Sequence, residues 1–135
     1  MKNTRFFFVG IIVLLMIAFA GCGNSGKKPD NMSDRAYELG CAALETTDDF
    51  IANKIGASDA VKKLDTVYDR IKRLVQDEKD ELESDTLVGT DYFRDDLINT
   101  YILSITIDIQ SKDRGTGTMS DVKESRNKLA KVLGK

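Results

Sequence analysis

The chain has 135 residues, 31% of them charged, and a net charge of −2 at neutral pH. It has no histidine and two cysteines, which excludes Ser-His-Asp triads, Cys/His nucleophile pairs and nearly all zinc sites. A weakly acidic chain of this size offers no electrostatic basis for binding nucleic acid and suits a single folded domain.

The chain begins with a basic start and a long apolar run. Lys2 and Arg5 precede the run, which extends from Phe6 to Ala20 without a charged or strongly polar side chain. This order is typical of an export signal. The run is apolar on all sides, unlike a soluble amphipathic helix, and it is shorter than the ~20 residues that a membrane-spanning helix needs. An uncleaved membrane anchor is the alternative.

The run leads into Phe19-Ala20-Gly21-Cys22. This segment resembles the lipobox of bacterial lipoproteins, although Phe19 stands where that pattern usually has leucine. The resemblance implies cleavage before Cys22, a diacylglyceryl thioether on its sulfur and often a further fatty acid, such as palmitate, on its amino group. We therefore expect a lipoprotein held by Cys22 on the extracytoplasmic face of the cell membrane, or of the outer membrane in a two-membrane cell.

Loss of a signal peptide at 1–21 would leave a lipidated cysteine and flexible linker at 22–32, followed by a helical domain at 33–135. The linker prediction rests on a segment rich in Gly, Ser, Asn and Lys that holds the only proline. With Cys22 consumed by lipid, we expect Cys41 to be a buried structural thiol outside any internal disulfide. A reactive thiol is the alternative.

Two helices are expected in the first half of the domain. Ser33 should cap the first, in which the small residues Gly40 and Ala43 would let another helix approach closely, and Gly56 should end it in left-handed backbone. Ser58 should cap the second. Its apolar residues recur in steps of four and three, as in the seam of an antiparallel bundle: Ala60, Leu64, Val67, Ile71 and Leu74.

Residues 77–85 are rich in Asp and Glu. A calcium site is one interpretation, but the segment lacks the alternating ligands, central glycine and terminal glutamate of an EF-hand loop. We favour a solvated helix end followed by a loop.

A third helix should start near Thr90 or Asp91. Its apolar residues cover more than half of the circumference, which indicates a central helix with two or more neighbours. Within it, residues 105–109 alternate as in a strand, and this remains an alternative. Thr100, Ser104 and Asp108 form a polar line in the apolar arc. A buried Asp108 could act as an acid or base. It could also pair with a lysine or arginine of a neighbouring helix, or lie near solvent in a frayed last turn, and we favour these structural interpretations because no second catalytic group accompanies it.

A loop is expected at 111–118. Its Gly115 and Gly117 are weak evidence for phosphate binding, because no P-loop lysine follows. Ser120 should cap a last helix, whose apolar face is formed by Val122, Leu129, Val132 and Leu133.

These elements predict an all-α fold, a small antiparallel bundle of three main helices plus a short C-terminal helix. The expected function is that of a binding or interaction module at the cell envelope, with the membrane as one partner through the lipid on Cys22 and an envelope protein as another. An inhibitor or immunity-type protein that protects the envelope from a hydrolase is the alternative. Enzymatic activity is least supported, and we expect no cofactor, metal ion, small-molecule ligand or nucleic acid.

Overall fold

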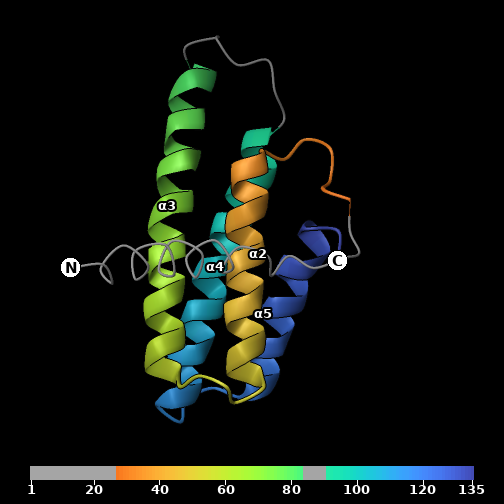
Figure 1. The fold of residues 1–135 in the computed structure, drawn as a ribbon. Coiled ribbons are helices and arrows are strands. Elements are labelled where there is room, and N and C mark those ends of the chain that lie inside the picture. Colours follow the sequence, from red (N-terminus) through yellow and green to blue (C-terminus); the bar gives the residue numbers. More distant parts are fainter. Residues whose placement is uncertain (1–26, 84–90) are drawn as a thin grey trace, which may run out of the picture.

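The computed structural model describes residues 27–83 and 91–135, so Cys22, the apolar run and the end of the acid-rich segment lie outside it. The described residues form α2 (Asp34–Ile51), α3 (Ala57–Glu83), α4 (Asp91–Asp113) and α5 (Met119–Val132), with no strand among them. Figure 1 shows the four helices side by side and alternating in direction along the chain. The predicted all-α antiparallel bundle is confirmed. The strand alternative at 105–109 is wrong, because these residues lie inside α4.

α4 contacts all three other helices, most extensively α3 and α5, and α2 also contacts all three, whereas α3 and α5 are not neighbours. This confirms the central position predicted for the third helix. Leu64 and Ile71 of α3 are fully buried, as the seam pattern predicts. Val67 and Leu74 are only half-buried, and Val75 fills the core beside them. The main buried side chains from α4 and α5 are Ile98, Ile102, Ile105, Ile109, Val122 and Leu129.

Ser33 caps α2, as predicted, and the helix packs closely on two neighbours. The Ser33 hydroxyl accepts a hydrogen bond from the Ala36 amide at 3.1 Å, which satisfies one of the free amides of the first turn. A Cβ atom placed on Gly40 would lie 2.7 Å from a methyl group of Leu133 and 3.3 Å from one of Ile98. The small side chain at Gly40 therefore permits the close approach that the sequence predicts.

The connection from α2 to α3 differs from the prediction. α2 ends at Ile51, and the residue in left-handed backbone is Asn53, with φ of 57°, rather than Gly56. Asparagine tolerates this conformation better than most residues, so glycine is not required here. Ser58 does not cap α3, because α3 has already begun at Ala57 and the Gly56 carbonyl accepts the Ala60 amide at 3.0 Å.

The turn from α4 to α5 is shorter than the predicted loop. α4 continues to Asp113, and Gly115, with φ of 75°, ends it in left-handed backbone. The cap of α5 is Thr118 and not Ser120. The Thr118 hydroxyl accepts from the Asp121 amide at 3.3 Å, while the Asp121 carboxylate accepts from the Thr118 amide at 2.7 Å. This reciprocal pair is a capping box.

The residues just before α2 fold against the bundle. Met32, which the sequence assigns to the linker, is only 2% exposed and belongs to the core. Lys28 is hydrogen-bonded to the Met32 carbonyl at 2.8 Å and forms an ion pair with Asp34 at 2.6 Å. Pro29 lies close to Gly134, next to the end of α5. The described chain therefore starts alongside the C-terminal end of α5.

Candidate functional site

The polar line on α4 is divided between solvent, its own helix and a contact with α5. Thr100 is exposed, and Ser104 donates to the Thr100 carbonyl within the same helix at 3.1 Å. Asp108 is half-buried and accepts a hydrogen bond from Ser125 of α5 at 2.6 Å. This contact supports the structural interpretation of Asp108, with a serine hydroxyl in place of the expected cation.

Two carboxyl side chains that the sequence analysis did not single out, Glu78 and Asp95, link α2, α3 and α4 at one end of the bundle. Asp95 of α4 is fully buried and accepts from both the hydroxyl and the amide of Ser33, the latter at 3.3 Å. Glu78 of α3 is hydrogen-bonded to Asp95 through its side chain. The other oxygen of Glu78, Oε2, is buried without a hydrogen-bond partner among the described residues. Ser33, Glu78 and Asp95 thus join the start of α2 to both α3 and α4.

The pair retains a proton near neutral pH. Burial raises the pKa of Glu78 from its ordinary 4.5 to about 8, and the charge on Asp95 contributes in the same direction. Burial also raises the pKa of Asp95, although the hydrogen bonds from Ser33 and Glu78 oppose that shift. A protonated Glu78 that donates a hydrogen bond to an ionised Asp95 accounts for the raised pKa of Glu78 and for the opposing effect of this hydrogen bond on the pKa of Asp95.

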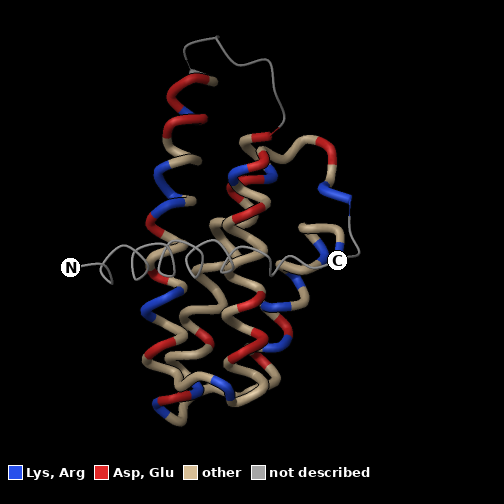
Figure 2. Tube along the Cα trace, in the orientation of Figure 1, with Lys and Arg blue, Asp and Glu red and all other residues tan. Residues whose placement is uncertain are grey.

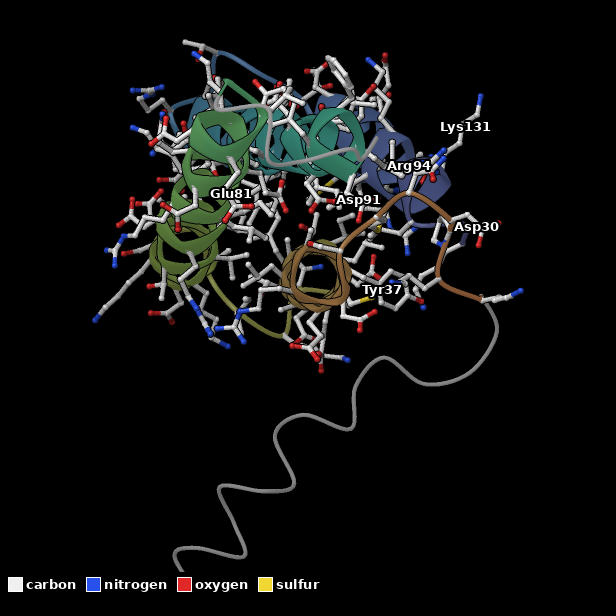
Figure 3. The ribbon with its side chains drawn as sticks, turned by 90° about the horizontal axis from the view of Figure 1, so that it is seen from above. Asp30, Tyr37, Glu81, Asp91, Arg94 and Lys131 are labelled. Atoms are coloured by element: carbon white, nitrogen blue, oxygen red, sulfur yellow. The ribbon has the colours of Figure 1, made fainter. Side chains whose placement is uncertain are left out.

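Further carboxylates surround this pair without forming a recognisable ion site. Asp91 on α4 and Glu81 on α3 both raise the pKa of Glu78 through their charges. Figure 3 shows Glu81 and Asp91 at this end of the bundle, and Figure 2 shows acidic residues concentrated at the same end of α3. Within the two described ranges, no group of three or more Asp, Glu, Cys or His side chains is arranged to hold a metal ion. Residues 84 and 85 of the predicted acidic segment lie outside the description.

α4 carries a stripe of exposed apolar side chains on the side away from the core. Phe93 is 66% exposed, Leu97 44%, Leu103 40% and Ile107 48%. At 100° per residue these four positions fall within about a third of the helix circumference, so they form one continuous face. We call these four residues the α4 stripe. The sequence predicted a central helix with two or more neighbours, and it did not indicate which part of this apolar surface would remain exposed.

A groove between α4 and α5 borders the stripe. Its volume is about 610 Å³, and it includes two stripe residues, Phe93 and Leu97, together with Tyr101 and Val132. The polar residues that line it are Asn31, Arg94, Lys128 and Lys131. Its lining therefore combines an apolar floor with three cations and contains neither Asp nor Glu. The size is within the range of ligand-binding clefts, ~300–1,000 Å³.

Cys41 is buried, as predicted, but it is not a thiol. The structure records it in a disulfide, so the expectation of a cysteine outside any disulfide is wrong for this state of the protein. The only other cysteine of the chain, Cys22, lies outside the described residues. One sulfur cannot form a thioether and a disulfide together, so lipid on Cys22 and a bond between these two sulfurs exclude each other. This pairing was not predicted, because the lipobox-like segment assigns Cys22 to lipid.

Comparison with known proteins gives no relative. No family model, curated protein or solved structure matches the chain. No helix among residues 27–83 and 91–135 is both long enough and apolar enough to span a bilayer.

Proposed function

We propose that this chain is a lipid-anchored protein of the cell envelope that binds a partner protein through the outer face of α4. The observation that carries the proposal is the α4 stripe, four large apolar side chains that are each at least 40% exposed on one helix face. Single exposed apolar residues are ordinary, but a continuous apolar face beside a groove is typical of interaction sites. No catalytic role is proposed, because Asp108 is engaged by Ser125.

The anchor is proposed from the sequence. The basic start, the apolar run and the lipobox-like Phe19-Ala20-Gly21-Cys22 support export and a lipid on Cys22. In the lipid-anchored protein Cys41 is therefore not bonded to Cys22. Two or three acyl chains hold a protein on a membrane durably, whereas one chain binds only marginally. The mass of the membrane-extracted protein tests this directly. A diacylglyceryl adduct on Cys22 supports the anchor, and a chain that carries an unmodified Cys22 in a disulfide contradicts it.

In-cell photo-crosslinking tests the binding role. A photoreactive amino acid at Leu97 or Ile107 of the full chain should give a discrete adduct with one envelope protein. The same amino acid at Lys63, an exposed position on α3, is the matched control and should give none. Leu97→Asp should abolish the adduct formed from position 107 while leaving the protein folded. Equal adducts from positions 63, 97 and 107 would contradict the proposal.

The inhibitor or immunity-type role is the second candidate, and the end of α3 favours it. α3 has 27 residues against 18 in α2, and Figure 1 shows it extending beyond the end of α2. Asp77, Asp80 and Glu81 make that extension acidic, as a segment that enters a basic enzyme cleft would be. If this role is right, Asp77→Lys with Asp80→Lys should abolish protection of the envelope while the Leu97 and Ile107 adducts are unaffected.

A further inference from the structure

The charges around the groove indicate what kind of partner the α4 stripe accepts. We propose that the stripe and groove bind an amphipathic helix whose apolar seam is flanked by acidic residues. This inference rests on the protein-binding role proposed above and specifies the chemistry of the partner.

The dimensions of the surface favour a helix as the occupant. From Phe93 to Ile107 the stripe extends over fourteen residue steps of α4, which corresponds to ~21 Å. Phe93 with Leu97, and Leu103 with Ile107, are each spaced by four residues and form two parallel ridges on one face, with a shallower line between them. Thr100 and Ser104 lie between these pairs and present small side chains. A helix of four to five turns could pack along this line, since ridges spaced by four residues fit the groove of another helix.

The cations favour acidic residues on the partner. Arg94, Lys128 and Lys131 line the groove, and Figure 3 shows Arg94 of α4 and Lys131 of α5 on the same side of the bundle. Arg94 and Lys131 form no ion pair with an acid among the described residues, whereas Lys128 pairs with Glu124 at 2.8 Å. Asp30 lies on that side too but does not line the groove. A partner helix along the stripe would place one flank against these cations.

A membrane surface is the other apolar and anionic occupant to consider. Two observations favour the helix over it. The groove is a concavity of about 610 Å³ between two helices, which suits a convex rod better than a flat bilayer. In addition, the net charge of the chain is −2, so the protein as a whole is not attracted to anionic lipid.

The test uses the full chain, processed by cells and reconstituted in phosphatidylcholine vesicles. The probes are two fluorescent, hydrocarbon-stapled helical peptides that share one leucine seam and carry either glutamate or lysine on both flanks. We expect the glutamate peptide to bind roughly tenfold or more tightly than the lysine peptide at low salt, and this preference to shrink as salt rises. Fluorescence anisotropy gives both affinities.

Charge reversal supplies the decisive comparison. Arg94→Glu combined with Lys131→Glu should invert the preference between the two peptides, whereas Lys62→Glu combined with Lys63→Glu, on the exposed side of α3, should leave it unchanged. Circular dichroism melting checks that both double variants remain folded. Equal affinity for the two peptides would contradict the proposed preference for acidic partners. The protein-binding role itself would still be decided by the crosslinking experiment.

Two further outcomes overturn the proposal. If neither peptide binds while Leu97 still crosslinks to an envelope protein, the partner is recognised by different chemistry and only this inference is lost. If an environment-sensitive fluorescent amino acid at Leu103 shifts to the blue when phosphatidylglycerol is added without peptide, the stripe binds the lipid surface instead.

Discussion

Ser33 has two roles that no local sequence pattern reveals. Its hydroxyl accepts from the Ala36 amide as the cap of α2 and also donates to the buried Asp95 of α4. The cap could be predicted because its partner lies three residues away. The contact with Asp95 spans 62 positions in the chain, and only the packing of α2 against α4 creates it. The burial of Asp95 could not be foreseen, because Asp91, Asp95 and Asp96 look alike in the sequence.

Glu78 should make stability depend on pH in an unusual direction. Its folded pKa, about 8, is higher than its ordinary value of 4.5, so the folded state holds the proton more tightly. The resulting stabilisation is complete below pH ~4.5 and is lost as the pH rises through 8. We expect the free energy of unfolding to fall between pH 5 and 8, and Glu78→Gln to remove much of that fall, because an amide stays neutral and still donates to Asp95.

Urea titrations at a series of pH values measure this effect. Asp77→Asn is the control, because Asp77 is an exposed neighbour on the same helix. It should leave the slope between pH 5 and 8 unchanged. A parent protein whose stability is flat across this range would show that Glu78 does not share a proton with Asp95.

Thr118 and Ser120 give a second prediction at this scale. Thr118→Ala removes the hydroxyl of the capping box and should cost about 1 kcal/mol of stability. Ser120→Ala should cost little, since Ser120 is exposed inside the first turn of α5 and alanine is the better helix former. Thermal melting of the two variants compares them, and equal losses would mean that the cap was assigned to the wrong residue. The sequence does hold a signal that separates them, because an acid, Asp121, stands three residues after Thr118, whereas Lys123 stands at that place after Ser120.

At the scale of the element, α4 shows both the value and the limit of hydrophobic periodicity. Its abundance of apolar residues predicted a central helix, and its contacts with α2, α3 and α5 confirm that. The same abundance made the exposed face impossible to predict. When a helix is apolar on nearly all sides, its sequence does not indicate which side the neighbouring helices cover. The buried side of α3 was easier to predict, because its apolar residues form one seam and the opposite side of the helix is charged. The stripe is therefore a feature that only the arrangement of the helices could expose.

Two isoleucines of α4 test the assignment of its faces. Ile105 is fully buried, whereas Ile107, two residues later, is 48% exposed. Ile105→Ala should lower stability by ~2–5 kcal/mol, while Ile107→Ala should cost less than ~1 kcal/mol. Chemical denaturation of both variants gives the difference. Similar losses at the two positions would mean that the stripe is covered in solution, for instance by a second copy of the chain.

At the scale of the whole molecule, the arrangement of the bundle followed from the sequence more reliably than its ends did. Short connections and four amphipathic or apolar segments predicted an antiparallel bundle, which the structure confirms. The residues before α2 were expected to be linker, yet Met32 is buried in the core. Its burial depends on where α2 and its neighbours leave space, and composition carries no information about that.

Replacement of Cys22 tests the proposed attachment of the molecule. Cys22→Ser removes the only sulfur that the lipobox-like segment offers for a thioether, so processing before residue 22 should stop. Fractionation with a high-salt wash and the mass of the product follow this outcome. A variant that is still cleaved before residue 22 and still sediments with membranes would contradict a lipid anchor. A Cys41→Ser variant is the control and should keep its lipid.

The place where the described chain starts has a consequence for how a partner is met. Asn31 lines the groove, and Lys27 and Pro29 lie beside Gly134 at the end of α5. If lipid holds Cys22, the groove opens next to the tether, and the few residues up to Lys27 extend at most about 20 Å. A helix carried by another membrane-bound protein would then reach the groove by diffusion in the plane of the membrane. Confinement of both proteins to one membrane would raise their local concentration relative to free diffusion, so that an intrinsically weak contact suffices.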